Sequence, residues 1–198
     1  VGQSGGRAES ATLSDYADDV VSVVRWLRKQ KDVDGNRMFV VGHSEGGAVA
    51  LIAASRTGDI KAVATIAAPG TKGSDLVLEQ QRRALDGLKI SDEEKQRRID
   101  LQKQIMNAVL TGTGWEGVPE AVRKQADTAW FRSFLQWEPT PVLKKVDQPL
   151  LILHGELDKQ VPLQNAELLN GLAAQRKKGP ATLVLVPGIN HLLVPAKT

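Results

Sequence analysis

The sequence contains no cysteine and no long apolar run. The lack of cysteine excludes disulfides, thiolate metal sites and a cysteine nucleophile. No apolar stretch approaches the roughly eighteen residues that a membrane-spanning helix needs, so we expect no membrane partner. The three histidines do not show a ligand spacing such as His-x-x-x-His, so we expect neither a metal site nor another cofactor.

The sequence also lacks an excess of charge of one sign. Its 26 Lys and Arg residues against 23 Asp and Glu residues give a net charge of only +3, and segments such as residues 92–98 carry both signs. A nucleic-acid-binding protein would gather positive charge into a patch, so we expect no nucleic-acid partner. With 198 residues, of which 41% are hydrophobic, the chain suits about one globular domain with a sizeable core.

One serine stands between glycines in residues 40–47, Val-Val-Gly-His-Ser-Glu-Gly-Gly. An apolar segment precedes this run and an alanine-rich segment follows it, which predicts a strand, a sharp turn and a helix. This is the sequence form of a nucleophile elbow, where Gly42 and Gly46 would leave room for a strained turn that exposes Ser44. The backbone N–H of Glu45 would then lie at a helix N-terminus and could donate to an oxyanion.

A serine hydroxyl is a weak nucleophile until a base takes its proton, so a histidine is required. His43 adjoins the serine and should support the turn or a pocket wall instead. His154 ends an apolar run and is followed by glycine and acidic residues. His191 follows a predicted strand and a loop, so we select His191 as the base.

The acid that orients this base should come from another strand end. Residues 153–158, Leu-His-Gly-Glu-Leu-Asp, supply two carboxylates. Asp158 is favoured because the residues after it form the rim of a loop that turns into a helix. Glu156 is the second choice, and Asp147 is the third.

The chain resembles the α/β-hydrolases, in particular bacterial esterases and the related dipeptidyl-peptidase-like hydrolases. The resemblance rests on three segments, namely residues 42–47, 153–158 and 188–191. The order serine, acid, histidine is that of this superfamily. The resemblance implies that Ser44 is the nucleophile, Asp158 the orienting acid and His191 the general base. It also implies an α/β-hydrolase fold, with a doubly wound, mostly parallel sheet and an inserted helical cap.

The two ends of the sequence bear on the same resemblance. Residues 1–7 resemble the glycine-rich loop that follows the fourth strand in this superfamily, and the chain stops at Thr198, soon after the proposed histidine. We therefore expect the fold to be incomplete, without the first strands, the second oxyanion donor and the last helix. A second chain that supplies the missing strands is an expected partner.

The remaining pattern predicts a core interrupted by one long insertion. Helices are expected at residues 12–31, with an apolar face of Tyr16, Val20, Val23, Val24 and Leu27, and at residues 164–176; strands are expected at residues 38–41, 62–67 and 182–186 and from Leu150. The insertion is too long for a plain loop. We divide the chain into a core of residues 1–70 and 142–198 and a helical cap of residues 71–141.

Within the insertion, residues 91–94, Ser-Asp-Glu-Glu, have the form of a capping box. A second helix is expected from Pro119 to about Leu135. Five aromatic residues concentrate here, and either line an acyl or aromatic pocket or pack the cap onto the core, so none is assigned to substrate: Trp115, Trp130, Phe131, Phe134 and Trp137.

The expected function is hydrolysis of small carboxylic esters through an acyl-enzyme intermediate. A small-peptide or acyl-amide hydrolase is the nearest enzymatic alternative. A second alternative, from another class, is a catalytically silent hydrolase-like fragment that serves as a structural or binding partner. The sequence does not indicate the substrate's acyl chain or leaving group.

Overall fold

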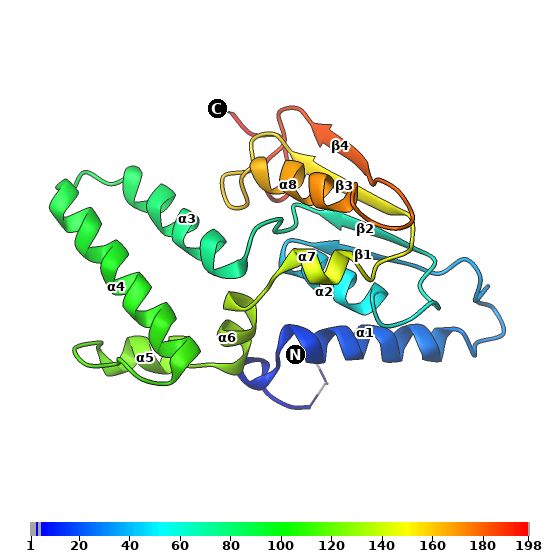
Figure 1. Ribbon diagram of the computed structural model, residues 1–198, viewed down its shortest axis with the longest axis horizontal. Coiled ribbons are helices and arrows are strands. Elements are labelled where there is room, and N and C mark those ends of the chain that lie inside the picture. The colour runs from blue at the N-terminus through cyan, green and yellow to red at the C-terminus, as the bar shows by residue number, and fades with distance from the viewer. Residues whose placement is uncertain (1–2, 4, 198) are drawn as a thin grey trace. The chain divides into compact units, whose positions relative to one another are not determined.

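The computed structural model describes residue 3 and residues 5–197 (Figure 1). Four strands form one sheet: β1 (Phe39–His43), β2 (Ala62–Ile66), β3 (Leu150–Gly155) and β4 (Thr182–Val186). All neighbouring pairs are parallel, in the order β1-β2-β3-β4. The parallel α/β sheet is therefore confirmed, and β4 has the bounds expected from its β-branched and leucine pattern. The carboxyl ends of all four strands meet at one edge, where open α/β sheets place their chemistry.

Helices occupy most of the rest of the described chain. Their bounds are η1 (Ala8–Ser10), α1 (Leu13–Leu27), α2 (Glu45–Ala54), α3 (Gly73–Asp86), α4 (Asp92–Thr111), α5 (Glu120–Ala126), α6 (Ala129–Leu135), α7 (Pro139–Leu143) and α8 (Gln164–Ala173). The glycine-rich N-terminal loop expected at residues 1–7 falls partly outside the described residues.

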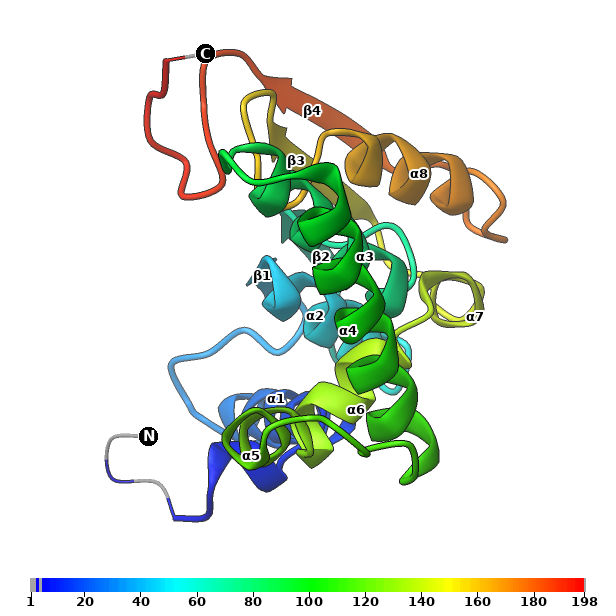
Figure 2. The same cartoon turned by 90° about the vertical axis from the view of Figure 1, so that its left-hand side faces the viewer.

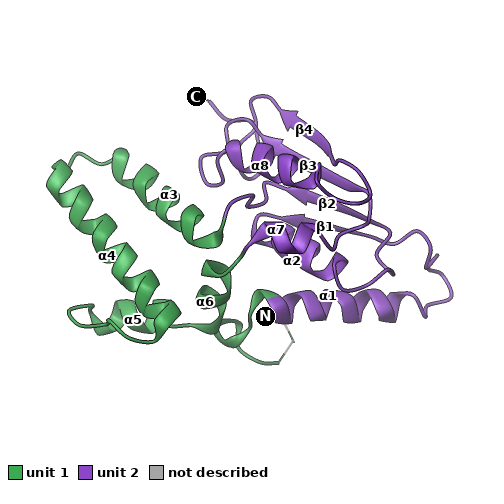
Figure 3. Ribbon diagram, viewed as in Figure 1, with its two compact units in different colours: residues 1–13, 72–137 green, residues 14–71, 138–198 purple. Residues whose placement is uncertain are grey.

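The chain divides into two compact units (Figure 3). Unit 1 consists of residues 1–13 and 72–137, and unit 2 consists of residues 14–71 and 138–198. The sheet lies entirely in unit 2, and α3, α4, α5 and α6 lie in unit 1. The expected division placed residues 1–13, 71 and 138–141 differently. Among these, η1 packs against α6, and the short helix α7 packs against α2 and α8.

Small side chains let helix α2 approach the sheet closely. It contacts β1 and β2, and its side chains are buried almost all round, including Ala48, Leu51 and Ala53. Burying a leucine such as Leu51 contributes roughly 2 kcal/mol, and the alanines add little helix cost. Helix α8 packs on β3 and β4, as both views of the ribbon show (Figures 1 and 2).

Helix α1 buries a face that overlaps in part with the one expected, since Val24 is buried and Tyr16, Val20 and Leu27 are half-buried. The buried positions are Leu13, Ala17, Val21 and Val24, whereas Val23 is 55% exposed. The alanine at position 17 was overlooked because the pattern was read from large side chains alone, although a spacing of three or four residues includes it.

Unit 1 has its own apolar core. Ile105, Met106 and Val109 of α4 pack with Trp115 and Leu135, and Phe131 packs against this cluster. Trp115 and Phe131 thus pack within unit 1 itself, a role that the two expected alternatives did not include. Helices α3 and α4 lie side by side (Figure 2).

Two local signals in unit 1 gave different outcomes. Ser91 caps α4 by accepting a hydrogen bond from the Glu94 N–H, as expected. In a full capping box the Glu94 carboxylate would bond back to the Ser91 N–H. Here it pairs with Arg98 and Arg97, whose hydrogen bonds lower the pKa of this carboxyl. The single helix expected from Pro119 to Leu135 was wrong: the chain breaks at Asp127, and Thr128 caps a new helix by accepting from the Phe131 N–H.

Candidate active site

Ser44 lies on a sharp turn between β1 and α2. Its backbone has φ 55° and ψ −125°, a combination that costs free energy for a residue with a side chain. The Ser44 N–H donates to the Ile66 carbonyl of β2 at 2.8 Å, which continues the sheet pairing into the turn. The Ser44 carbonyl then accepts from the Gly47 N–H at 2.9 Å and starts the helix. Strain of this kind is typical of a nucleophile elbow.

The glycines around Ser44 have different reasons to be glycine. A side chain on Gly42 would overlap the Gly46 carbonyl, and one on Gly47 would press on the Cβ of Ala68. A Cβ at Gly46 would meet nothing within 4 Å. Packing therefore requires glycine at position 42, as expected. The second position where packing requires glycine is 47, and not 46.

His191 and Asp158 are hydrogen-bonded partners. The His191 Nδ1–H donates to Asp158 Oδ2 at 2.8 Å, and both side chains are largely removed from solvent. The other carboxylate oxygen, Oδ1, accepts from the backbone N–H groups of Gln160 and Val161 at 2.9 and 2.8 Å. A carboxylate held in this way orients the imidazole and stabilises it when it becomes charged.

The loops that carry this pair are joined by backbone contacts. The Leu157 N–H donates to the Ile189 carbonyl at 2.9 Å, which joins the two loops. Within the second loop, Asn190 Oδ1 accepts from the Leu192 N–H at 3.0 Å. Gly155, at the end of β3, must lack a side chain because a Cβ would overlap the Ile189 carbonyl. The loops after β3 and β4 therefore approach closely enough for Asp158 to reach His191.

The other two acids considered do not lie at this position. Glu156 and Asp147 are exposed, and Asp147 precedes β3, at the opposite end of that strand from Asp158. Of the three carboxylates, Asp158 is the one that bonds to His191.

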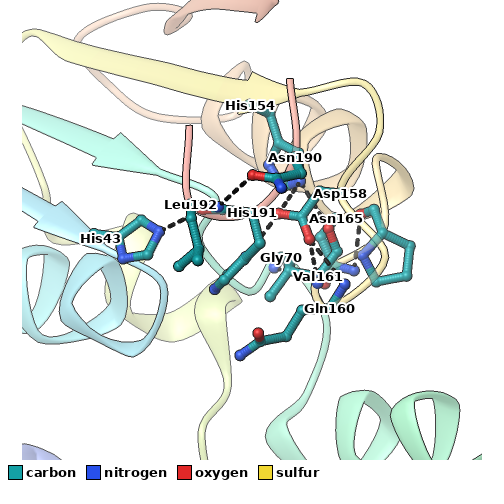
Figure 4. Close-up of polar contacts among 11 residues, drawn as sticks. His43, Gly70, His154, Asp158, Gln160, Val161, Asn165, Asn190, His191 and Leu192 are labelled. Atoms are coloured by element: carbon teal, nitrogen blue, oxygen red, sulfur yellow. Dashed lines mark hydrogen bonds and ion pairs between the residues drawn. The ribbon is translucent and has the colours of Figure 1, made fainter. Parts of the chain in front are cut away.

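His43 contacts the His191 loop directly. The His43 Nε2–H donates to the His191 carbonyl oxygen at 2.8 Å, and the two rings are 4.8 Å apart, tilted by 46°. In Figure 4, His191 lies between His43 and Asp158. His43 was expected to support the turn or a pocket wall. It directly precedes Ser44, and its hydrogen bond joins the end of β1 to the backbone of the proposed base. No local pattern could have indicated this link, because the partners are 148 residues apart.

A shallow hollow of about 270 Å³ adjoins His191. Leu157, Gln160, Asn190 and Leu192 line it, together with two lysines, Lys159 and Lys197. This space suits a small group beside the proposed base. Ser44 follows β1 directly, and the N–H of Glu45, the first residue of α2, lies at that helix's N-terminus.

The described residues offer neither a metal site nor a membrane-spanning helix. Within residue 3 and residues 5–197, no group of three His, Cys, Asp or Glu side chains could hold a metal ion. None of the helices in that part of the chain is both long and apolar enough to span a membrane.

Comparisons with known proteins place this arrangement in context. The alpha/beta hydrolase family matches residues 2–196. The chain is 27% identical to the uncharacterized peptidase YtmA of Bacillus subtilis and 29% identical to the bifunctional esterase/perhydrolase DCH of Acinetobacter calcoaceticus. These matches cover 89% and 90% of this chain but only 56% and 67% of the relatives, so the chain spans between half and about two thirds of their length.

Solved structures agree on the fold. The ferulic acid complex of Est1E from Butyrivibrio proteoclasticus matches 97% of this chain and 66% of its own, with 22% identity and a TM-score of 0.60. Dipeptidyl peptidase 4 of Porphyromonas gingivalis matches 94% of this chain and 21% of its own, with 19% identity and a TM-score of 0.55.

Proposed function

The chain belongs to the alpha/beta hydrolase family, and from this premise we propose that it is a serine hydrolase which cleaves carboxylic esters through an acyl-enzyme intermediate. The observation that carries the proposal is the bonded pair His191–Asp158 at the same sheet edge as the strained turn at Ser44. Both parts are needed, because a serine without a base does not attack esters at neutral pH.

In the proposed reaction, His191 Nε2 takes the Ser44 hydroxyl proton as Oγ attacks the ester carbonyl carbon. Asp158 holds Nδ1–H and thereby presents the other ring nitrogen to the serine. The N–H of Glu45 stabilises the tetrahedral oxyanion. The imidazolium gives its proton to the departing alcohol, which leaves the acyl group on Ser44. Water then attacks the acyl carbon while His191 takes its proton, and His191 returns this proton to Ser44 Oγ as the acid departs.

The proposal is tested by treating the purified protein with a fluorophosphonate and mapping the modified residue by mass spectrometry. The expected result is one adduct, on Ser44, because the reagent reports an activated serine hydroxyl. A heat-unfolded sample should remain unlabelled and is the control. A folded sample without an adduct at Ser44 would contradict the proposed function.

Amide substrates are the nearest enzymatic alternative. One of the curated relatives is named a peptidase and another an esterase/perhydrolase. An amide needs its poorer leaving group protonated before it departs, and His191 would serve both cases. Comparing kcat/KM for an ester and the matching amide distinguishes the two.

A second candidate function, a silent fragment that serves as a binding partner, rests on the open edge of β1. Phe39 and Val41 are 69% and 53% exposed, and β1 pairs only with β2 among the described strands. Exposed apolar sheet edges are templates for pairing with another strand. We propose that a strand from outside residues 1–198 pairs with this edge, and that strand would complete the sheet for either function.

We expect the 198-residue chain to self-associate through this edge when no such strand is present. The variant Val41→Lys should shift the protein toward monomer in light scattering across a concentration series, because charge on an edge strand opposes pairing. Leu168→Lys is the matched control, since Leu168 is 48% exposed on α8, away from β1. Intact mass spectrometry shows whether a second polypeptide accompanies the chain. A lone chain that stays monomeric at every concentration would contradict this proposal.

A further inference from the structure

His154 is a completely buried histidine next to the proposed catalytic pair. It belongs to β3, and its Nε2 lies 2.8 Å from the Val161 carbonyl oxygen. Its other nitrogen, Nδ1, is buried and has no hydrogen-bond partner among the described residues. Figure 4 shows His154 beside Asp158.

The protonation of the His154 ring follows from these contacts. A carbonyl oxygen only accepts, so Nε2 carries the hydrogen. Nδ1 then carries a lone pair that accepts from no donor. A hydrogen on Nδ1 would instead be a buried N–H without an acceptor, which costs more free energy. An apolar side chain of similar size would fill the same space without the unpaired Nδ1, but it would take away the donor to the Val161 carbonyl. Packing alone therefore does not account for an imidazole at this position.

The Nε2–H bond acts on the residue that holds the proposed acid. Val161 accepts from His154 through its carbonyl and donates through its N–H to Asp158 Oδ1 at 2.8 Å. Both polar groups of the Val161 backbone are thereby fixed, one to β3 and one to the carboxylate. With Oδ1 held in this way, Oδ2 faces His191.

His154 also lies close to Oδ2 itself. The distance from Nε2 to Asp158 Oδ2 is 3.5 Å, which is too long for a strong bond while the hydrogen points at Val161. The positive end of the N–H dipole still lies beside the carboxylate in a site without solvent, where its field is weakly screened. This contact adds to the hydrogen bonds that hold the carboxylate beside His191.

We propose that His154 is a positioning residue, which holds the turn of residues 158–161 so that Asp158 Oδ2 meets His191 Nδ1. The proposal rests on the roles assigned to Asp158 and His191 in the proposed function. It predicts that the Nε2–H donor, and not the bulk of the ring, is what the site requires.

Two substitutions of similar size separate the donor from the bulk. His154→Leu fills the space without a donor, whereas His154→Gln places an amide N–H near the former Nε2 position. The first readout is the NMR signal of the His191 ring N–H, which a bond to a carboxylate shifts downfield and protects from exchange. This signal is assigned by its loss in His191→Gln. The second readout is the rate of phosphonate labelling at Ser44.

In His154→Leu we expect the downfield signal to broaden or disappear and labelling to slow on the order of a hundredfold, as for a displaced catalytic group. His154→Gln should retain the signal and most of the rate. Unchanged signals in both variants would overturn the proposal, as would equal loss in both. If His154→Leu does not fold, His154→Asn, whose amide is too short to reach Val161, takes its place.

The two readouts keep this proposal separate from the proposed function. The ring N–H signal depends on the bond between Asp158 and His191 and needs no turnover. Failure of phosphonate labelling in the unaltered protein would count against the hydrolase proposal, whereas the NMR comparison would still decide the role of His154.

Discussion

Replacing Ser44 with alanine is expected to abolish turnover of a chromogenic short-chain ester. Loss of the nucleophile from a triad lowers kcat by roughly four orders of magnitude or more, because neither proton transfer nor acyl-enzyme formation can follow. The residual rate would come from binding and the oxyanion donor. The same variant should take up no phosphonate at position 44.

The fold should survive this change. Alanine adopts the Ser44 backbone conformation at about the same cost as serine, and the turn is held by backbone bonds to Ile66 and Gly47. The free energy of unfolding, measured in urea, should therefore stay within about 1 kcal/mol of the original. Ser22→Ala, on the exposed face of α1, is the control that should leave turnover unchanged. Equal activity in Ser44→Ala would remove the assignment of the nucleophile.

Replacing Gly42 with alanine should have the largest effect on stability and also prevent labelling of Ser44. The added Cβ would overlap the Gly46 carbonyl, which belongs to the first turn of α2. Backbone atoms cannot rotate away as a side chain can, so β1 and α2 must separate. Overpacking in a closed site costs about 3 kcal/mol, a large part of the stability of a small domain. Urea denaturation and phosphonate labelling measure the two effects.

Gly46→Ala provides the matched control two residues beyond Ser44. Its Cβ would meet nothing within 4 Å, and alanine favours a helix over glycine by about 1 kcal/mol. We expect this variant to be as stable as the original or slightly more so, and to label at Ser44. Similar losses in both variants would show that the spacing of glycines, and not the contact at Gly42, governs the turn.

Much of the local structure could be predicted because it depends on neighbouring residues. Strand β4, the turn at Ser44 and the cap at Ser91 follow from side-chain pattern, glycine content and one side-chain oxygen, respectively. The break between α5 and α6 was missed, although Thr128 could have signalled it, since threonine is a common N-cap residue. The roles of Ser44, Glu45 and the loop pair in catalysis stay predictions until they are measured.

Other features depend on where the chain returns in space. Asp158 and Glu156 were separated by an argument about loop shape, but only the close approach of the loops at Gly155 and Ile189 places Asp158 on His191. The bond from His43 to the His191 carbonyl and the bond from His154 to Val161 could not be assigned from the sequence. Each joins a side chain to a backbone group whose position the fold alone establishes.

The sequence by itself determined the family, and it predicts the chemistry from a serine on a glycine-flanked turn with an acid and a histidine in the order of the alpha/beta hydrolases. Residue type and local spacing are sufficient for this, because the elbow is a short-range structure. The tertiary structure decided which glycine is sterically required, which acid meets the histidine, and that β1 keeps an open apolar edge. The Gly42 contact depends on the exact path of the turn, which residue types do not specify. The other two features depend on distances between segments far apart in the chain, and parallel strands bring such segments together only after the sheet has formed.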